Sequence, residues 1–434
     1  MITFEIGCHR PARLAAAYGP GIFWSAVLTV VISVGLAGFS SPVNAAELTE
    51  IEKRGEYLAT AGNCVSCHTS DNGKAFVGGL DFETPFGTIY STNITPDPET
   101  GIGQWSLEEF TAAMREGVGR EGEHLYPVFP YTSFTNVSDE DIAAIFAYLK
   151  TLTPVKSTPP ENDLGFPYNQ RWALGLWKAL YFDEARYEPQ PEQSAEWNRG
   201  AYLVEGLGHC GMCHSPRNFM GAIDTDLAMT GGRYMERVEG KLSAWSAPNL
   251  TSAPSGLAKW SDEDIQDYLK LGFSHRAGVF GPMNKVVVNS TRHMTDEDVR
   301  AMTVYLKSLP ANAQDSGKPA SEDVLRAGSL QYDIHCGTCH LPTGEGSSET
   351  GPPLLGSPVV MDTDPASLIN ITLYGAQTPK TPPSPEWQAR EWKRMEAFDS
   401  KLTDEQAAAL LSFVRASWGH EAGAVTAKQV AEQR

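Results

Sequence analysis

The chain has 434 residues and carries 34 basic against 53 acidic side chains, which gives a net charge of −19 at neutral pH. A chain of this length predicts about three domains of ordinary size. The acidic charge excludes nucleic-acid binding through backbone phosphates, because such binding depends on clustered lysine and arginine. The charge fits either simple solubility or steering toward a basic partner, and solubility is the simpler interpretation.

The N-terminal segment has the features of an export signal. Arg10 and Arg13 precede an apolar run over residues 22–39, and small residues follow, with a cleavage site predicted at residues 43–45. This order is typical of a secretory signal peptide, which we assign to residues 1–45. Because the apolar run is close to membrane-spanning length, an uncleaved anchor is the alternative. In both cases we expect the rest of the chain to be exported.

Three pentapeptides of the form Cys-x-x-Cys-His occur in the chain. They are Cys64-Val65-Ser66-Cys67-His68, Cys210-Gly211-Met212-Cys213-His214 and Cys336-Gly337-Thr338-Cys339-His340. This form is typical of c-type haem attachment, in which both thiols bond to one porphyrin edge and the adjacent imidazole binds the iron. We therefore predict three covalently attached haem c groups.

Other interpretations of the cysteines fit less well. A zinc site built from two Cys-x-x-Cys pairs usually separates them by about 15–20 residues, whereas here more than one hundred residues lie between successive pairs. A thioredoxin-like motif needs a βαβ pattern, which is missing around these cysteines. Disulfides would not explain the histidine after each pair. The seventh cysteine, Cys8, lies in the predicted signal segment.

The sequence around the three motifs repeats, which predicts three tandem domains. We name the predicted domains unit one (residues 46–157), unit two (195–310) and unit three (321–419). A connector (158–194), a short linker (311–320) and a polar tail (420–434) complete the chain. Each unit opens with an arginine-headed helix that begins near Arg54, Arg199 or Arg326.

Each unit is predicted to close with a capped helix. Ser138, Thr295 and Thr403 each stand three positions before an acidic residue or glutamine, which is the pattern of a capping box. Apolar residues recur behind these caps at helical spacing. We expect one ring from each closing helix to cross the opening helix, and the candidates are Phe146, Tyr305 and Phe413.

The connector contains a stripe of large apolar residues on a predicted helix. The stripe consists of Trp172, Leu176, Trp177, Leu180 and Phe182. Such a stripe is usually packed against the protein's own domains, and this is the interpretation we favour. The alternative is a docking surface for another subunit or for the membrane interface.

Two methionines are candidates for the sixth iron ligand. Met283 follows Gly281-Pro282 before the closing helix of unit two, and Met395 holds a similar place in unit three. Thioether sulfur raises the potential of a haem that only carries electrons. The alternative is that these methionines fill gaps in the core. Met294 competes weakly, because it adjoins the cap of the closing helix.

Unit one differs at this place. Phe129 stands where a methionine would be expected, and its side chain cannot bind iron. Met114 and His124 are the nearby alternatives, and a site without a sixth ligand is the third possibility. His124 lies beside three glycines, at which the backbone could bend.

These features resemble those of the three-haem cytochrome c subunits of bacterial membrane-associated dehydrogenases. The resemblance rests on the three haem motifs, the Gly-Pro-Met segment at residues 281–283 and the Leu-Tyr-Pro-x-x-Pro-Tyr segment at residues 125–131. It implies a mainly α fold of three tandem cytochrome c-like domains, each wrapped round one covalent haem. It also implies iron binding by His68, His214, His340, Met283 and Met395, with haem attachment at Cys64, Cys67, Cys210, Cys213, Cys336 and Cys339.

The resemblance further implies an electron-transfer subunit without substrate chemistry of its own. It would take electrons from a flavin, quinoprotein or molybdenum dehydrogenase subunit and pass them to ubiquinone or another acceptor. It would be periplasmic, with peripheral association at the outer face of the bacterial inner membrane. The alternative is a multihaem oxidoreductase that acts on a small substrate or peroxide through an open first haem, since Phe129 leaves that site in question.

Overall fold

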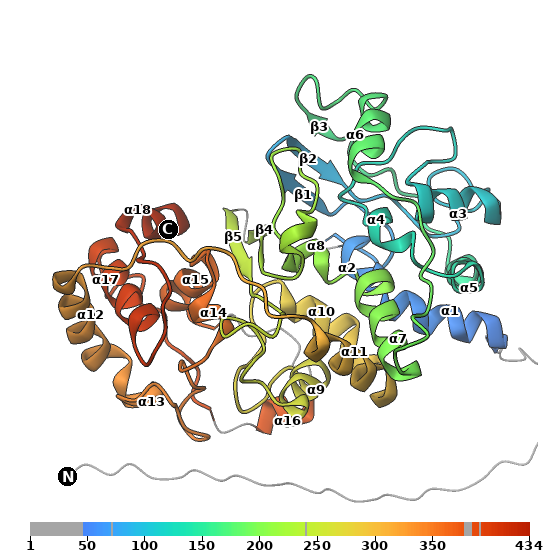
Figure 1. Cartoon of the computed structure of the whole chain (residues 1–434). Coiled ribbons are helices and arrows are strands. Elements are labelled where there is room, and N and C mark those ends of the chain that lie inside the picture. Colours follow the sequence, from blue (N-terminus) through green and yellow to red (C-terminus); the bar gives the residue numbers. More distant parts are fainter. Residues whose placement is uncertain (1–46, 71–72, 239–240, 377–383, 390–391) are drawn as a thin grey trace, which may run out of the picture. The chain divides into compact units, whose positions relative to one another are not determined.

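A computed structural model describes residues 47–70, 73–238, 241–376, 384–389 and 392–434. The predicted signal segment and Cys8 lie outside these residues. The described chain is mainly helical, as predicted, with only a few short strands (Figure 1). None of the described helices is long and apolar enough to cross a membrane.

An opening helix and a closing helix pack against each other in each unit. The pairs are α1 (Glu50–Ala61) with α5 (Asp139–Thr151), α7 (Ala195–Ala201) with α11 (Asp296–Ser308), and α12 (Glu322–His335) with α17 (Asp404–Ala416). The third pair lies side by side in Figure 1. The closing helices begin directly after Ser138, Thr295 and Thr403, so the predicted caps are confirmed.

A glycine lies at each of these helix crossings. A Cβ atom on Gly55, Gly200 or Gly328 would lie 1.9, 2.0 or 2.1 Å from the carbonyl oxygen of an alanine on the closing helix. Any side chain at these positions would therefore force the helices apart. The same glycines face the Cβ atoms of Tyr148, Tyr305 and Phe413.

Two details of the predicted repeat were wrong. Tyr148 takes the place at the crossing that was expected for Phe146, whose ring instead packs on Phe110 at 4.9 Å. The glycine at the crossing directly follows Arg54 in unit one, whereas one residue, Ala327, stands between Arg326 and Gly328 in unit three. Arg326 is therefore displaced by one residue from the position of Arg54.

The opening helix of unit two contains one residue more before its haem motif than that of unit one. It accommodates this residue by passing from α7 into a π-helix, η1 (Tyr202–Leu207). A π turn is the usual way for a helix to absorb one inserted residue. The glycine crossing and the haem motif can therefore keep their places despite the longer segment.

Short helical turns hold the haem motifs: α2 (Cys64–Cys67), α8 (Gly211–His214) and α13 (Gly337–His340). Units one and two share a further helix, α3 (Leu107–Glu116) and α9 (Asp262–Leu271) respectively, each with a complete capping box. The remaining helices are α4 (Tyr131–Phe134), α6 (Ala173–Tyr181), α10 (Met283–Asn289), α14 (Pro358–Met361), α15 (Ala366–Tyr374), α16 (Pro385–Ala389) and α18 (Ala427–Gln433), with 3₁₀ turns η2 (Thr225–Leu227) and η3 (Thr291–His293).

The strands were not foreseen from the sequence. Strands β1 (Asp81–Thr84), β2 (Gly87–Tyr90) and β3 (Asp163–Leu164) form one antiparallel sheet, and β4 (Gly232–Val238) pairs with β5 (Lys241–Ala247). The β4–β5 hairpin links all three units. Arg237 on β4 pairs with Asp81 of unit one, while Ser246 and Ala244 on β5 accept hydrogen bonds from α15 of unit three at 2.7 Å.

The helix predicted in the connector is present as α6, but its stripe is packed only in part. Trp177 is buried, and its indole N–H donates to the carbonyl of Met220 at 3.0 Å. Phe182 is half-buried and packs edge-on against Tyr131 at 5.2 Å. Trp172, Leu176 and Leu180 are exposed to solvent. Three of the five large apolar side chains of the stripe are therefore mostly exposed.

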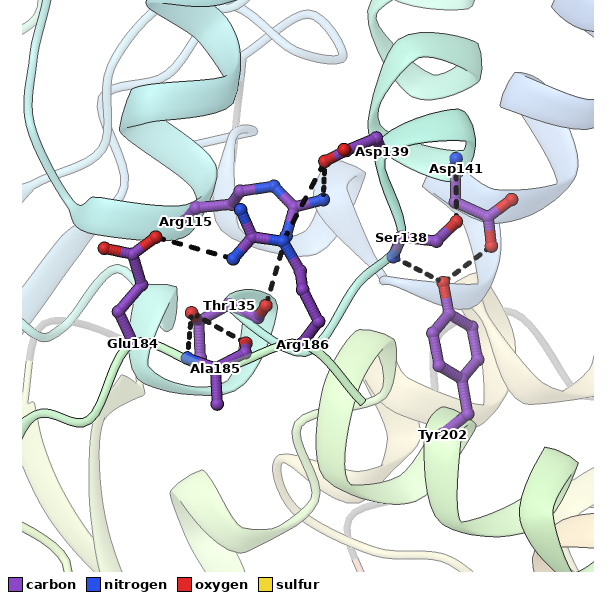
Figure 2. Close-up of polar contacts among 9 residues, drawn as sticks. All are labelled: Arg115, Thr135, Ser138, Asp139, Asp141, Glu184, Ala185, Arg186 and Tyr202. Carbon is purple, nitrogen blue, oxygen red and sulfur yellow. Dashed lines mark hydrogen bonds and ion pairs between the residues drawn. The ribbon is translucent and has the colours of Figure 1, made fainter. Parts of the chain in front are cut away.

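Units one and two are joined by a reciprocal contact, which we call the tyrosine lock. The Tyr202 hydroxyl of unit two donates to Asp141 of unit one at 2.6 Å (Figure 2). The Tyr57 hydroxyl of unit one donates to Asp298 of unit two, also at 2.6 Å. Each tyrosine lies on an opening helix, and each aspartate lies in the first turn of the other unit's closing helix.

The aspartates of the lock are also held within their own units. Arg54 donates to Asp141 at 2.8 Å, and Arg199 donates to both carboxylate oxygens of Asp298 at 2.8 and 2.7 Å. Burial alone would raise the pKa of Asp298, but the hydrogen bonds from Arg199 and Tyr57 outweigh burial and lower it. Both aspartates therefore bind the neighbouring unit instead of completing their capping boxes.

Unit three lacks the lock. Counted from the glycine of the crossing, Leu330 stands where Tyr57 and Tyr202 stand, and Gln406 replaces the aspartate. The Gln406 side chain accepts from the backbone N–H of Thr403 at 2.9 Å and so completes a capping box. Leu330 and Ile334 on α12 are left exposed.

We expect Tyr57→Phe or Tyr202→Phe to lower the free energy of unfolding by about 1.5–3 kcal/mol, the usual value of a hydrogen bond to a charged group. For Tyr57→Phe, the loss should shrink as the pH falls through the lowered pKa of Asp298, because the protonated acid accepts weakly. Chemical denaturation at several pH values measures both effects. Tyr126→Phe is the control, because its hydroxyl donates only to a backbone carbonyl. Equal effects for all three variants would contradict a lock.

Candidate haem-binding sites

The three motif histidines share one hydrogen-bond arrangement. The Nδ1 atoms of His68, His214 and His340 lie 2.6, 2.7 and 2.9 Å from the backbone carbonyl oxygens of Thr92, Pro248 and Pro352 respectively. Because a carbonyl oxygen can only accept, each Nδ1 must carry the hydrogen. Each Nε2 is then left with a free lone pair, which is the state of a histidine that binds a metal.

Burial keeps the site residues neutral. It lowers the pKa of all three histidines, so that the imidazoles are unprotonated at neutral pH. It raises the pKa of Cys64, Cys210 and Cys336 to about 12. A nucleophilic redox cysteine instead needs a lowered pKa. Moreover, no three metal-binding side chains converge anywhere in the described chain, as a zinc site would require.

Unit two contains a cavity of about 230 Å³ between its haem motif and helix α10. Cys210, Cys213 and His214 line this cavity, and so does Met283, the first residue of α10. The structure therefore brings the predicted attachment cysteines and both predicted iron ligands of unit two to one apolar space. Met294, the weaker candidate, also lines the cavity.

Two tryptophans test whether this cavity fits a haem. Trp245 on β5 and Trp260 before α9 both line it, and both are buried. Their indole N–H groups have no acceptor in the part of the chain that the structure describes. Buried donors normally have a partner, so a group with acceptors belongs here. The two carboxylates of a haem supply such acceptors within an otherwise apolar molecule, and the site therefore fits the group.

Both other units contribute to the wall of this cavity. Ala61 and Asn63 come from unit one, and Pro358 and Val359 come from α14 of unit three. Helix α10 of unit two also adjoins the haem motif of unit one, because Asn289 donates to Ser66 within that motif at 2.9 Å. Unit two therefore lies in contact with the units on both sides.

In unit one, Met114 and His124 lie in different surroundings. Met114 on α3 is buried in the core cluster that Cys64 and Phe129 also join. Counted from the caps of α3 and α9, Met114 corresponds to Leu269, which lines the cavity of unit two. By contrast, the Nδ1 atom of His124 lies 3.1 Å from Lys178 Nζ, beneath α6.

In unit three, Met395 packs against the same hydrophobic core as Cys336. Leu354 and Trp418 join this core from the loop after the haem motif and from the end of the closing helix. The structure thus brings the attachment motif and the methionine of unit three to one cluster. His340 is buried as well.

Sequence reasoning missed the role of the β4–β5 hairpin. Trp245 reaches the unit-two cavity from this hairpin, and its N–H has no acceptor among the described residues. Exposed and buried residues do not alternate along β5: Lys241 and Leu242 are exposed, and three consecutive buried residues follow at positions 244–246, so the segment lacks the usual strand pattern. A tryptophan in a polar segment was the only sequence signal that could have pointed to it.

The family model for cytochrome c matches residues 52–153 and 325–418. Together with the histidine geometry and the cavity, this match defines the chain as a c-type cytochrome that binds haem covalently. The predicted fold class is therefore confirmed: the chain is mainly helical and contains tandem cytochrome c domains.

Two similar proteins show which kind of c-type cytochrome this chain is. The chain is 39% identical to the cytochrome c subunit of a quinone alcohol dehydrogenase from Gluconobacter oxydans, over 88% of this chain and 82% of that protein. It is 37% identical to the gluconate 2-dehydrogenase cytochrome c subunit of Pantoea cypripedii, over 93% and 94%. The chain belongs to the family of dehydrogenase cytochrome c subunits, which transfer electrons and leave substrate chemistry to another subunit.

A third relative is longer. The chain is 41% identical to a nicotinate dehydrogenase subunit of Pseudomonas putida over 90% of its own length, but it spans only 32% of that protein.

We expect Trp260→Phe and Trp245→Phe each to lower the midpoint potential of one haem. Loss of an N–H donor leaves a carboxylate charge less compensated, which favours ferric iron. A redox titration of the haem-loaded chain measures the shift. Trp197→Phe is the matched control, because that indole already donates to Ser308 at 2.6 Å. Unchanged potentials in both cavity variants would contradict the fit.

Proposed function

We propose that the chain carries three haem c groups and passes electrons from a dehydrogenase catalytic subunit to ubiquinone or another respiratory acceptor. The observation that carries this proposal is the cavity of unit two, whose wall includes residues of both other units. Electron transfer is fast only across short distances, so a central site in contact with both neighbours suits a relay.

The residues that would hold the haems follow from the motifs. Each haem would be bonded to two cysteines and bound at its iron by the Nε2 atom of His68, His214 or His340. A bound haem c supplies an iron that exchanges one electron at a time. The chain's own residues exclude water, orient the imidazoles through the carbonyls of Thr92, Pro248 and Pro352, and set the potentials by ligand type and burial.

We assign the sixth ligands of the second and third haems to Met283 and Met395. Met283 is supported by its place in the cavity that His214 also lines. Met395 is supported by its packing in the core cluster that contains Cys336. Sulfur ligation would give these haems raised potentials.

For the first haem we propose Met114 as the sixth ligand. Its position corresponds to that of Leu269, which faces the cavity of unit two, whereas the His124 ring faces Lys178. Phe129 would then pack beside the haem without binding it. A different ligand position would give this haem a potential of its own.

We expect the catalytic partner to be a dehydrogenase subunit, because the relatives are cytochrome c subunits of alcohol and gluconate dehydrogenases. Purifying the native complex and adding the partner's substrate tests the function. We expect the substrate to reduce the haems only when the partner is present, because this chain contributes electron transfer alone. Reduction of the isolated chain by the substrate would contradict the proposal.

The proposed location, the periplasmic face of the inner membrane, depends on residues 1–45 acting as an export signal.

We expect Met283→Ala to lower one midpoint potential and remove the sulfur-to-iron absorption band of one haem, because the variant lacks the thioether. Near-infrared absorption and redox titration measure this. Met294→Ala is the matched control, since Met294 lines the same cavity. If the band survives in the Met283 variant and disappears in the Met294 variant, the ligand assignment is wrong.

We expect the oxidised wild-type chain to give only low-spin haem signals in electron paramagnetic resonance, because all three irons would have six ligands. Met114→Leu should convert one haem in three to a high-spin form that binds cyanide. A high-spin haem already present in the wild type would show that the first iron is open and would favour the oxidoreductase alternative. Low-spin signals in both proteins would point to His124 instead.

A further inference from the structure

Strand β4 runs from the haem motif of unit two to the sheet of unit one. At its start, a Cβ atom on Gly232 would lie 2.4 Å from the carbonyl oxygen of Cys213, so the strand touches the second haem motif directly. Near its end, Arg237 pairs with Asp81 of unit one at 3.1 Å. The strand therefore packs against both α8 of unit two and β1 of unit one (Figure 1).

Tyr234 stands in the middle of this strand. It pairs with Trp245 of β5, and both side chains line the cavity of unit two together with Cys213. Burial raises the pKa of Tyr234, and the charges of the Cys213 and Cys67 thiolates raise it further. A charge shifts a pKa in this way only from a short distance. Tyr234 therefore lies close to attachment cysteines of two different units.

The same two cysteines are also close to each other. The pKa of Cys67 is raised to about 11, first by burial and second by the charge of Cys213. Lys285 of α10 opposes this rise, and its Nζ atom lies 2.8 Å from Glu236 of β4. The second cysteine of each motif therefore reaches one place beside β4. We call Cys67, Cys213 and Tyr234 the β4 junction.

This junction differs from the other contacts between units one and two. Its two sulfur atoms are those that would bond to a porphyrin edge, so each haem would continue into the junction through a covalent bond. The tyrosine lock, by contrast, involves no residue of a haem motif. An aromatic ring beside both sulfurs adds packed atoms at the point where the two motifs approach. Electrons cross packed atoms more readily than an open gap.

We propose that electrons pass between units one and two through the β4 junction, where Tyr234 is a positioning residue whose ring keeps the path filled. This inference rests on the proposed function and adds to it a route and a residue. One electron moves in each passage, oxidising ferrous iron in one unit and reducing ferric iron in the other. No proton moves, so Tyr234 keeps its hydroxyl hydrogen.

Rapid mixing of the native complex with its substrate tests this route. In the wild type we expect one fast phase of reduction for all haems. Tyr234→Leu should split it into a fast and a slow phase, because without the ring units one and two exchange electrons slowly. Tyr234→Phe keeps the ring and should restore the single phase. The matched control is Tyr268→Leu, which removes a tyrosine that lines the same cavity from α9 and should behave like the wild type.

Two measurements on the isolated haem-loaded chain separate a path from other roles of Tyr234. Redox titration gives the differences in potential between the haems, and electron paramagnetic resonance reports how strongly the oxidised irons interact. We expect Tyr234→Leu to leave both unchanged. A slow phase that accompanies a changed potential or a weaker interaction would mean that Tyr234 tunes or holds the haems, and would overturn the proposal.

A single fast phase in Tyr234→Leu would overturn it as well, and so would equal slowing in Tyr268→Leu. In these cases the proposed function would still stand, provided that the substrate reduces the wild-type haems only when the catalytic partner is present.

Discussion

The close crossing of two helices at a glycine is the constraint on which each unit depends. At Gly55, Gly200 and Gly328 the opening helix lies directly against a backbone carbonyl of the closing helix. The haem motif follows the opening helix within a few residues in every unit. The crossing therefore sets where the two cysteines and the histidine stand relative to the core. Even the extra residue of unit two is absorbed by a π turn, which leaves the crossing intact.

The units differ in what lies outside this crossing. In units one and two the tyrosine and the aspartate near the crossing bind the other unit, so two similar domains meet reciprocally. Unit three replaces both residues and joins unit two instead through α15 and the β4–β5 hairpin. The central unit is therefore held by two unlike interfaces. Both bring neighbouring residues to the wall of its cavity, which is how the fold would support electron transfer along the chain.

The sequence predicted the parts of the structure that depend on local patterns. The haem motifs, the caps Ser138, Thr295 and Thr403, and the helical fold follow from spacings of a few residues. Met283 was found in the same way, and it lines the cavity with His214. The tyrosine lock and the hairpin could not be predicted, because their contacts join residues far apart in the chain. The exposure of Trp172, Leu176 and Leu180 was also missed, since an apolar helical stripe does not show whether anything covers it.

The central claim is that electrons pass through the site of unit two, and a chain without that haem tests it most directly. Cys210→Ser, Cys213→Ser should yield a chain with two haems by intact mass. In rapid mixing of the purified complex with its substrate, we expect all three haems of the wild type to be reduced quickly. In the variant only one of the two remaining haems should be reduced at that rate. Rapid reduction of both would show that electrons do not need unit two, and would contradict the account.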